Sequence, residues 1–87
     1  MKNMHSILIA DDEKHVRNDI IQSMHWSDYG FYIIGEAENG RQALQMIQDL
    51  QPDVLITDIK MPFANGLKLI ESAHQIKPDI QDRKSVV

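Results

Sequence analysis

Three aspartates in this sequence stand directly after runs of apolar residues. Asp11 and Asp12 follow "ILIA", and Asp58 follows "VLIT". Carboxylate oxygens are the ligands that hard cations such as Mg²⁺ and Mn²⁺ prefer, and a carboxylate beside such a cation can accept a phosphoryl group. The functional question is whether the fold brings these three side chains together.

Each aspartate also has an ordinary structural interpretation. An aspartate that follows a strand usually caps a helix or forms a turn, and Asp12 stands just before the helix that we expect to begin at Lys14. Asp58 fits such a role less well, because it follows the apolar run directly and precedes Ile59. The functional interpretation therefore depends on the three acids as a group.

Short apolar runs alternate with segments of helical periodicity along the chain. Apolar and β-branched residues predict strands at 6–12, 31–38 and 53–57. Apolar residues that recur at steps of three and four predict helices at 14–24, 41–50 and 67–76. This alternation indicates an α/β fold, a three-layer sandwich in which helices cover a parallel sheet.

The order of the strands decides where the acids lie. Right-handed crossovers limit the topology, and if the third strand lies on the free side of the first, the sheet order is 2-1-3. Open α/β sheets bind ligands beside the carboxyl ends of the strands, at the point where this order reverses. Asp11, Asp12 and Asp58 would then share one crevice, and their mutual repulsion would raise the pKa of at least one carboxyl unless a cation neutralises them.

Composition excludes several classes of protein. The 87 residues suffice for one small domain, with 43% hydrophobic and 25% charged residues, as in soluble globular proteins. Cysteine is absent, which excludes disulfides and thiolate metal sites, and the net charge of -4 comes with scattered basic residues. Without a basic stripe, a membrane-length apolar run or a signal peptide, we expect a cytoplasmic chain that binds neither nucleic acid nor membrane directly.

Four motifs in sequence order resemble the receiver domain of two-component response regulators: "ILIADDE", "GEAENGRQAL", "PDVLITDIKMP" and Gly66. The resemblance implies a flavodoxin-like (CheY-like) fold in which Asp58 is phosphorylated by a histidine kinase. It also implies that Asp11, Asp12 and Asp58 hold Mg²⁺ together with the backbone carbonyl of Lys60. The motifs "DIKMP" and "GEAENG" are similar to those of regulators with an AraC-type DNA-binding output domain, which implies transcription regulation.

The resemblance extends from about Ile7 to about Gln81, and there the chain departs from the family pattern. That pattern calls for an apolar fourth strand that ends in Ser or Thr and a fifth strand that ends in Lys, whereas "DIQDRKSVV" is mostly polar. We therefore predict a partial receiver at 1–81, truncated after its third helix, and a non-family tail at 82–87. Neither Lys84 nor Ser85 is assigned a role, so poor phosphotransfer and switching are expected.

Two other functions compete with this interpretation. A third strand without a neighbour would expose an open edge, through which the fragment could associate with itself as a homodimer or with another receiver. An aspartyl phosphohydrolase usually has a second acid two residues after its nucleophile, and here Lys60 occupies that position. We therefore expect that the chain is not an enzyme.

Overall fold

A computed structural model describes residues 4–23, 25–58 and 66–85, with the backbone alone at 58, 66–67 and 82–85. All six predicted strands and helices are present, and a short 3-10 helix and a fourth strand are added to them. In chain order the elements are β1 (His5–Ala10), α1 (Lys14–Gln22), η1 (Trp26–Tyr29), β2 (Phe31–Ala37), α2 (Gly40–Leu50), β3 (Val54–Asp58), α3 (Gly66–Ile76) and β4 (Gln81–Ser85).

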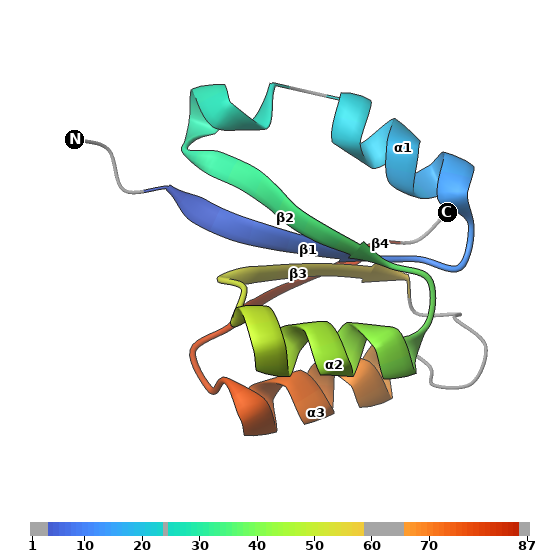
Figure 1. The fold of residues 1–87 in the computed structure, drawn as a ribbon, viewed down its shortest axis with the longest axis vertical. Helices are drawn as coiled ribbons and strands as arrows, with labels where there is room; N and C mark the ends of the chain where they lie inside the picture. Colours follow the sequence, from blue (N-terminus) through green and yellow to red (C-terminus); the bar gives the residue numbers. More distant parts are fainter. Residues whose placement is uncertain (1–3, 24, 59–65, 86–87) are drawn as a thin grey trace.

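The sheet is parallel and has the order β2-β1-β3-β4. The predicted order 2-1-3 is therefore confirmed for the first three strands. Figure 1 shows α1 and η1 on one face of the sheet, and α2 and α3 side by side on the other. The three layers expected from the alternating pattern are thus in place.

The expectation that the chain lacks a fourth strand is wrong. β4 pairs with β3 along its whole length, from Val54 beside Gln81 to Asp58 beside Ser85. Its start is fixed by the buried side chain of Ile80, which is 2% exposed. An edge strand needs backbone partners on one side only and commonly carries charges, so the polar sequence of β4 does not prevent pairing.

Because β4 covers β3, the predicted open edge of the third strand does not exist in the described chain. The association that we expected through this edge loses its structural basis. The boundary between a receiver at 1–81 and a tail at 82–87 stays a prediction, although the backbone at 82–85 continues the sheet.

The main hydrophobic core lies between the sheet and the pair α2 and α3. Burying one Leu or Ile side chain in such a core contributes about 1.5–3 kcal/mol. Gly35 lets α2 approach the sheet closely, because a Cβ at this position would collide with Cε of Met46. The buried members of the core come from β1, β2, β3, α2 and α3 and from the residue just before β4: Leu8, Ala10, Ala37, Ala43, Ile47, Leu55, Leu69, Ile70, Ala73 and Ile80.

β2 contains one residue more than regular pairing with β1 requires. Ile7 lies beside Ile33, but Leu8 lies beside Gly35, so Ile34 is the extra residue of a β-bulge. Side chains alternate between the faces of a strand, and the extra residue shifts this alternation by one. Beyond the bulge, Glu36 consequently lies on the α1 face of the sheet.

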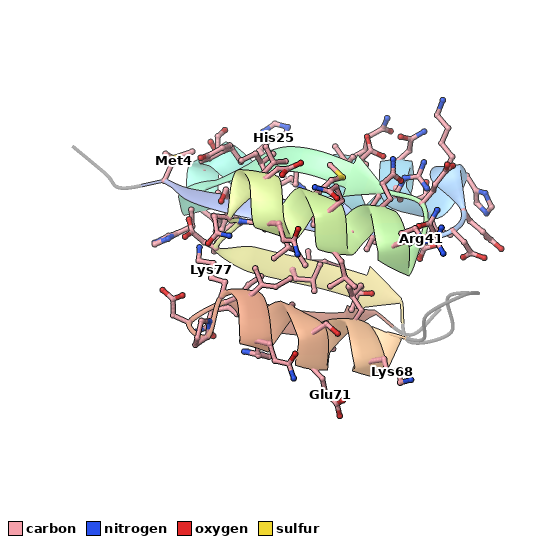
Figure 2. The ribbon with its side chains drawn as sticks, turned by 60° about the horizontal axis from the view of Figure 1, so that its bottom comes forward. Met4, His25, Arg41, Lys68, Glu71 and Lys77 are labelled. Carbon is pink, nitrogen blue, oxygen red and sulfur yellow. The ribbon has the colours of Figure 1, made fainter. Side chains whose placement is uncertain are left out.

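Lys77 ties three elements together at the end of the sheet opposite to the predicted site (Figure 2). Its Nζ donates to the carbonyl oxygens of Gln51 and Pro52, both at 2.9 Å, and to Oδ1 of Asp53 at 3.2 Å. These bonds link the end of α2 and the start of β3 to the residue that follows α3. They also give hydrogen-bond partners to the backbone carbonyls of Gln51 and Pro52, which follow α2.

Asp53 also binds β1 through Ser6. Its Oδ2 accepts the backbone N–H of Ser6 at 2.9 Å, and its own N–H donates to Oγ of Ser6 at 3.0 Å. The Ser6 N–H is the largest cause of a lowered pKa at Asp53; partial burial opposes it, and Lys77 and His5 lower the pKa further. The ionised carboxylate is therefore favoured in the folded state.

We predict that Asp53→Asn lowers the free energy of unfolding at pH 7 by about 1 kcal/mol or less, since solvent screens this partly exposed group. A carboxyl whose pKa is depressed by folding stabilises the protein above its ordinary pKa, and this contribution is lost as the pH falls. The difference in the free energy of unfolding between wild type and variant, measured with urea, should accordingly decrease below about pH 4.

The matched control is Asp19→Asn, which removes an exposed acid on α1. It should change the free energy of unfolding by no more than about 0.5 kcal/mol at either pH. A gap for Asp53→Asn that stays constant from neutral to acidic pH would contradict the prediction, because it would show that the charge is not responsible.

Candidate functional site

The ends of β1 and β3 lie side by side in the centre of the sheet. The last backbone pair between them joins Ala10 to Thr57. Asp11 follows Ala10 directly, and Asp58 follows Thr57 as the last residue of β3. The backbones of both residues therefore reach the same edge of the sheet, where the strand arrowheads in Figure 1 point toward the starts of α1 and α2.

Asp11 is anchored where β1 ends. It is 2% exposed, its N–H donates to the carbonyl oxygen of Ala37 at 2.9 Å, and its Oδ1 accepts the N–H of Glu13 at 2.9 Å. Asp12, by contrast, is exposed to solvent. One acid of the pair is thus held inside the protein while its neighbour reaches water.

The capping interpretation of Asp12 is wrong. α1 begins at Lys14 with Glu13 as its N-cap residue, and the Glu13 side chain makes no capping bond. The nearest equivalent is the bond from the Glu13 N–H to Asp11, which turns the chain from β1 toward the helix. Asp12 is consequently not needed to start α1.

Two members of the predicted ligand set lie outside the described residues: the side chain of Asp58 and the carbonyl of Lys60. Within the part of the chain that the structure describes, no group of three His, Cys, Asp or Glu side chains could hold a metal ion. Asp11 and Asp12 do supply adjacent carboxylates, one buried and one exposed. Such oxygen donors fit a hard cation such as Mg²⁺, which usually keeps several of its waters.

Sequence reasoning missed two residues near this edge, Arg17 and Glu36. Arg17 is the buried residue of α1, its Nη1 donates to the carbonyl oxygen of Asp11 at 2.6 Å, and its Nε donates to Oε1 of Glu36 at 3.0 Å. A signal was present, because Arg17 lies three residues before Ile20 and beside Val16, within the apolar stripe of the helix. An arginine on that stripe needs an acceptor on the sheet.

A pocket lies elsewhere, and neither Asp11 nor Asp12 lines it. It measures about 510 Å³ and lies on the α1 face, at the opposite end of the strands. Its walls are mostly apolar, and they are formed by His5, Ile7, Trp26, Phe31, Asp53, Val54, Ile56 and Gln81.

Among the helices of the described chain, none is both long enough and apolar enough to cross a membrane.

The chain is similar to known transcriptional regulators. It is 38% identical over 78 residues to the uncharacterized transcriptional regulatory protein YesN of Bacillus subtilis, which covers 90% of this chain and 21% of that protein. It is 43% identical over 67 residues to the transcriptional regulatory protein HptR of Staphylococcus aureus, which covers 77% of this chain and 27% of that protein. The chain thus spans about a quarter or less of these curated relatives.

Solved structures show the same similarity. The REC domain of AraT, a response regulator from Geobacillus stearothermophilus, matches with a TM-score of 0.89 and 33% identity over 93% of this chain and 63% of that one. A two component transcriptional regulator AraC from Clostridium phytofermentans matches with a TM-score of 0.86 and 33% identity over 92% of this chain and 64% of that one.

A family model described as the response regulator receiver domain matches residues 7–81, which is most of the chain. The parallel sheet of order 2-1-3, the acids at its carboxyl edge and the sequence relatives agree with this match. The chain belongs to the response regulator receiver domains of two-component systems.

Proposed function

We propose that this chain is a phosphoacceptor domain in which Asp58 takes a phosphoryl group from a histidine kinase with the help of Mg²⁺. The observation that supports this most strongly is the pairing of Ala10 with Thr57. The acids that follow these two residues stand on neighbouring strands at one edge of the sheet, which is where open α/β sheets bind their ligands.

The transfer needs few parts from the protein. A carboxylate oxygen of Asp58 attacks the phosphorus of the phosphohistidine in line; a P–O bond forms while the P–N bond breaks, and its electron pair stays with the imidazole nitrogen. Asp11, Asp12, Asp58 and the carbonyl of Lys60 would hold Mg²⁺, which would supply positive charge to neutralise the phosphoryl oxygens. The burial of Asp11, which is 2% exposed, supports a fixed position for its carboxylate in this set.

The regulated process in this proposal is transcription. YesN and HptR are named as transcriptional regulatory proteins, and the Clostridium relative is named as a two component transcriptional regulator AraC. With a net charge of -4 and scattered basic residues, the present chain has no nucleic-acid-binding stripe of its own. DNA binding would belong to an output domain, and the signal would reach it from Asp58.

The expected poor competence in phosphotransfer rested on a missing fourth strand and on the unassigned roles of the Ser or Thr that ends it and of the Lys that ends a fifth strand. Since β4 is present and pairs Ser85 with Asp58, the first of these reasons no longer holds, whereas the second is unchanged. The degree of competence stays a prediction that the stoichiometry of phosphorylation measures.

We predict that Asp58→Asn abolishes phosphorylation of the chain by a small phosphodonor such as acetyl phosphate in the presence of Mg²⁺. Intact-mass spectrometry should show one added phosphoryl group on wild type and none on the variant. Asp53→Asn, at the far end of the sheet, is the control and should retain acceptance. Phosphorylation of Asp58→Asn would disprove the assignment, and stoichiometric labelling of wild type would disprove poor competence.

The same variant separates a functional role from a structural one. Asp58→Asn should change the free energy of unfolding by less than about 1 kcal/mol. It could even stabilise the fold, because removing one carboxylate relieves repulsion within the acidic group. A large fall in the melting temperature would show that Asp58 is needed for folding.

We also predict that phosphorylation requires a divalent cation and that Asp12 contributes to its affinity. EDTA should stop the reaction, and Asp12→Asn should raise the Mg²⁺ concentration for half-maximal rate by about tenfold or more. Because Asp12 is exposed, the substitution should change the free energy of unfolding by no more than about 0.5 kcal/mol. Equal rates with and without EDTA would contradict the metal site.

A further inference from the structure

We infer that Arg17 is a positioning residue for the acidic pair: its guanidinium fixes the peptide group that joins Asp11 to Asp12 and so orients both carboxylates. This inference rests on the proposed function of the same edge of the sheet. It assigns a role to a side chain that neither binds the metal nor contacts the phosphoryl group.

The contacts of Arg17 are directed and buried. Its side chain is 11% exposed, its Nη1 donates to the carbonyl oxygen of Asp11 at 2.6 Å, and its Nε donates to Oε1 of Glu36 at 3.0 Å. Taking a guanidinium out of water is costly unless its donors are paired. The planar fork of arginine holds both acceptors in one fixed geometry, which a flexible lysine cannot do.

By binding the carbonyl oxygen of Asp11, Arg17 can orient two side chains at once. The oxygen of Asp11 and the nitrogen of Asp12 belong to one planar peptide group. Asp11 is already held through its N–H by Ala37 and through Oδ1 by the N–H of Glu13. The bond from Arg17 adds a third anchor, after which the backbone has little freedom to turn either carboxylate away.

The β-bulge makes this arrangement geometrically possible. With Ile34 as the extra residue, Ile9 lies beside Glu36, and both lie on the α1 face. Without the bulge, Ile34 would lie beside Leu8 and Gly35 beside Ile9, and alternation would turn Glu36 toward α2. Bulges commonly re-aim a side chain next to a functional site, and here the bulge aims Glu36 at Arg17.

A purely structural ion pair would have a different signature. It would lower the stability of the fold without changing how the remaining folded molecules bind a cation. If Arg17 positions the carboxylates, its loss lowers the cation affinity although the carboxylates themselves are unchanged, because they are less well oriented. Cation affinity and stability must therefore be measured on the same variants.

The test uses the 87-residue chain as wild type, Arg17→Met, Arg17→Lys and Glu36→Ala, with Arg41→Met as control for an exposed arginine. Calorimetry with Mg²⁺ alone gives the affinity, and circular dichroism with urea gives the folded fraction. Arg17→Met should weaken Mg²⁺ binding about tenfold, as loss of a residue that orients a ligand does. Arg17→Lys should recover part of the loss, and Arg41→Met should match wild type.

A metal-free measurement keeps the inference separate from the proposed function. Hydrogen exchange at the Glu13 amide, which binds Asp11, should be faster in Arg17→Met than in wild type. If Arg17→Met does not fold, Glu36→Ala decides, because Glu36 is a partly exposed residue whose loss leaves Arg17 with one anchor. If the folded variant binds Mg²⁺ and exchanges the Glu13 amide as wild type does, the proposed role of Arg17 is overturned. Phosphorylation of Asp58→Asn would overturn only the proposed acceptor.

Discussion

Parallel pairing between β1 and β3 holds the centre of the sheet, and it sets Ala10 beside Thr57. Parallel strands end on the same side, so the residues that follow these two cannot separate unless the pairing breaks. β1 is almost fully buried from Ile7 to Ala10, with at most 1% exposure. The burial that stabilises the fold is therefore the same interaction that keeps the acids of β1 and β3 on neighbouring strand ends.

Local patterns in the sequence predict most of this fold. Apolar runs locate the first three strands because strands covered on both faces need apolar residues at every position. β4 could not be predicted in this way, because Asp82, Arg83 and Lys84 interrupt any apolar pattern. Its pairing depends on the backbone of β3 and on Ile80, and neither of these is visible in the local composition of residues 81–85.

The site was predictable only where it depends on strand ends. The topology places the backbones of Asp11 and Asp58 at one edge, as the alternating pattern indicates. The contact between Arg17 and Glu36 could not be predicted in this way, because it crosses from α1 to β2 and depends on the β-bulge at Ile34. The hydrogen bond at the start of α1 was assigned to Asp12, but Asp11 makes it, since the helix begins one residue after Glu13.

The three donors of the Lys77 ammonium have three protein oxygens within hydrogen-bonding distance, on Gln51, Pro52 and Asp53. Reagents that acylate amines need an accessible nitrogen, and the side chain of Lys77 is only 15% exposed. Labelling of Lys77 would thus require the connection between α2 and β3 to open first. The rate at which Lys77 is acylated would therefore report local unfolding at this end of the sheet, opposite to the acids.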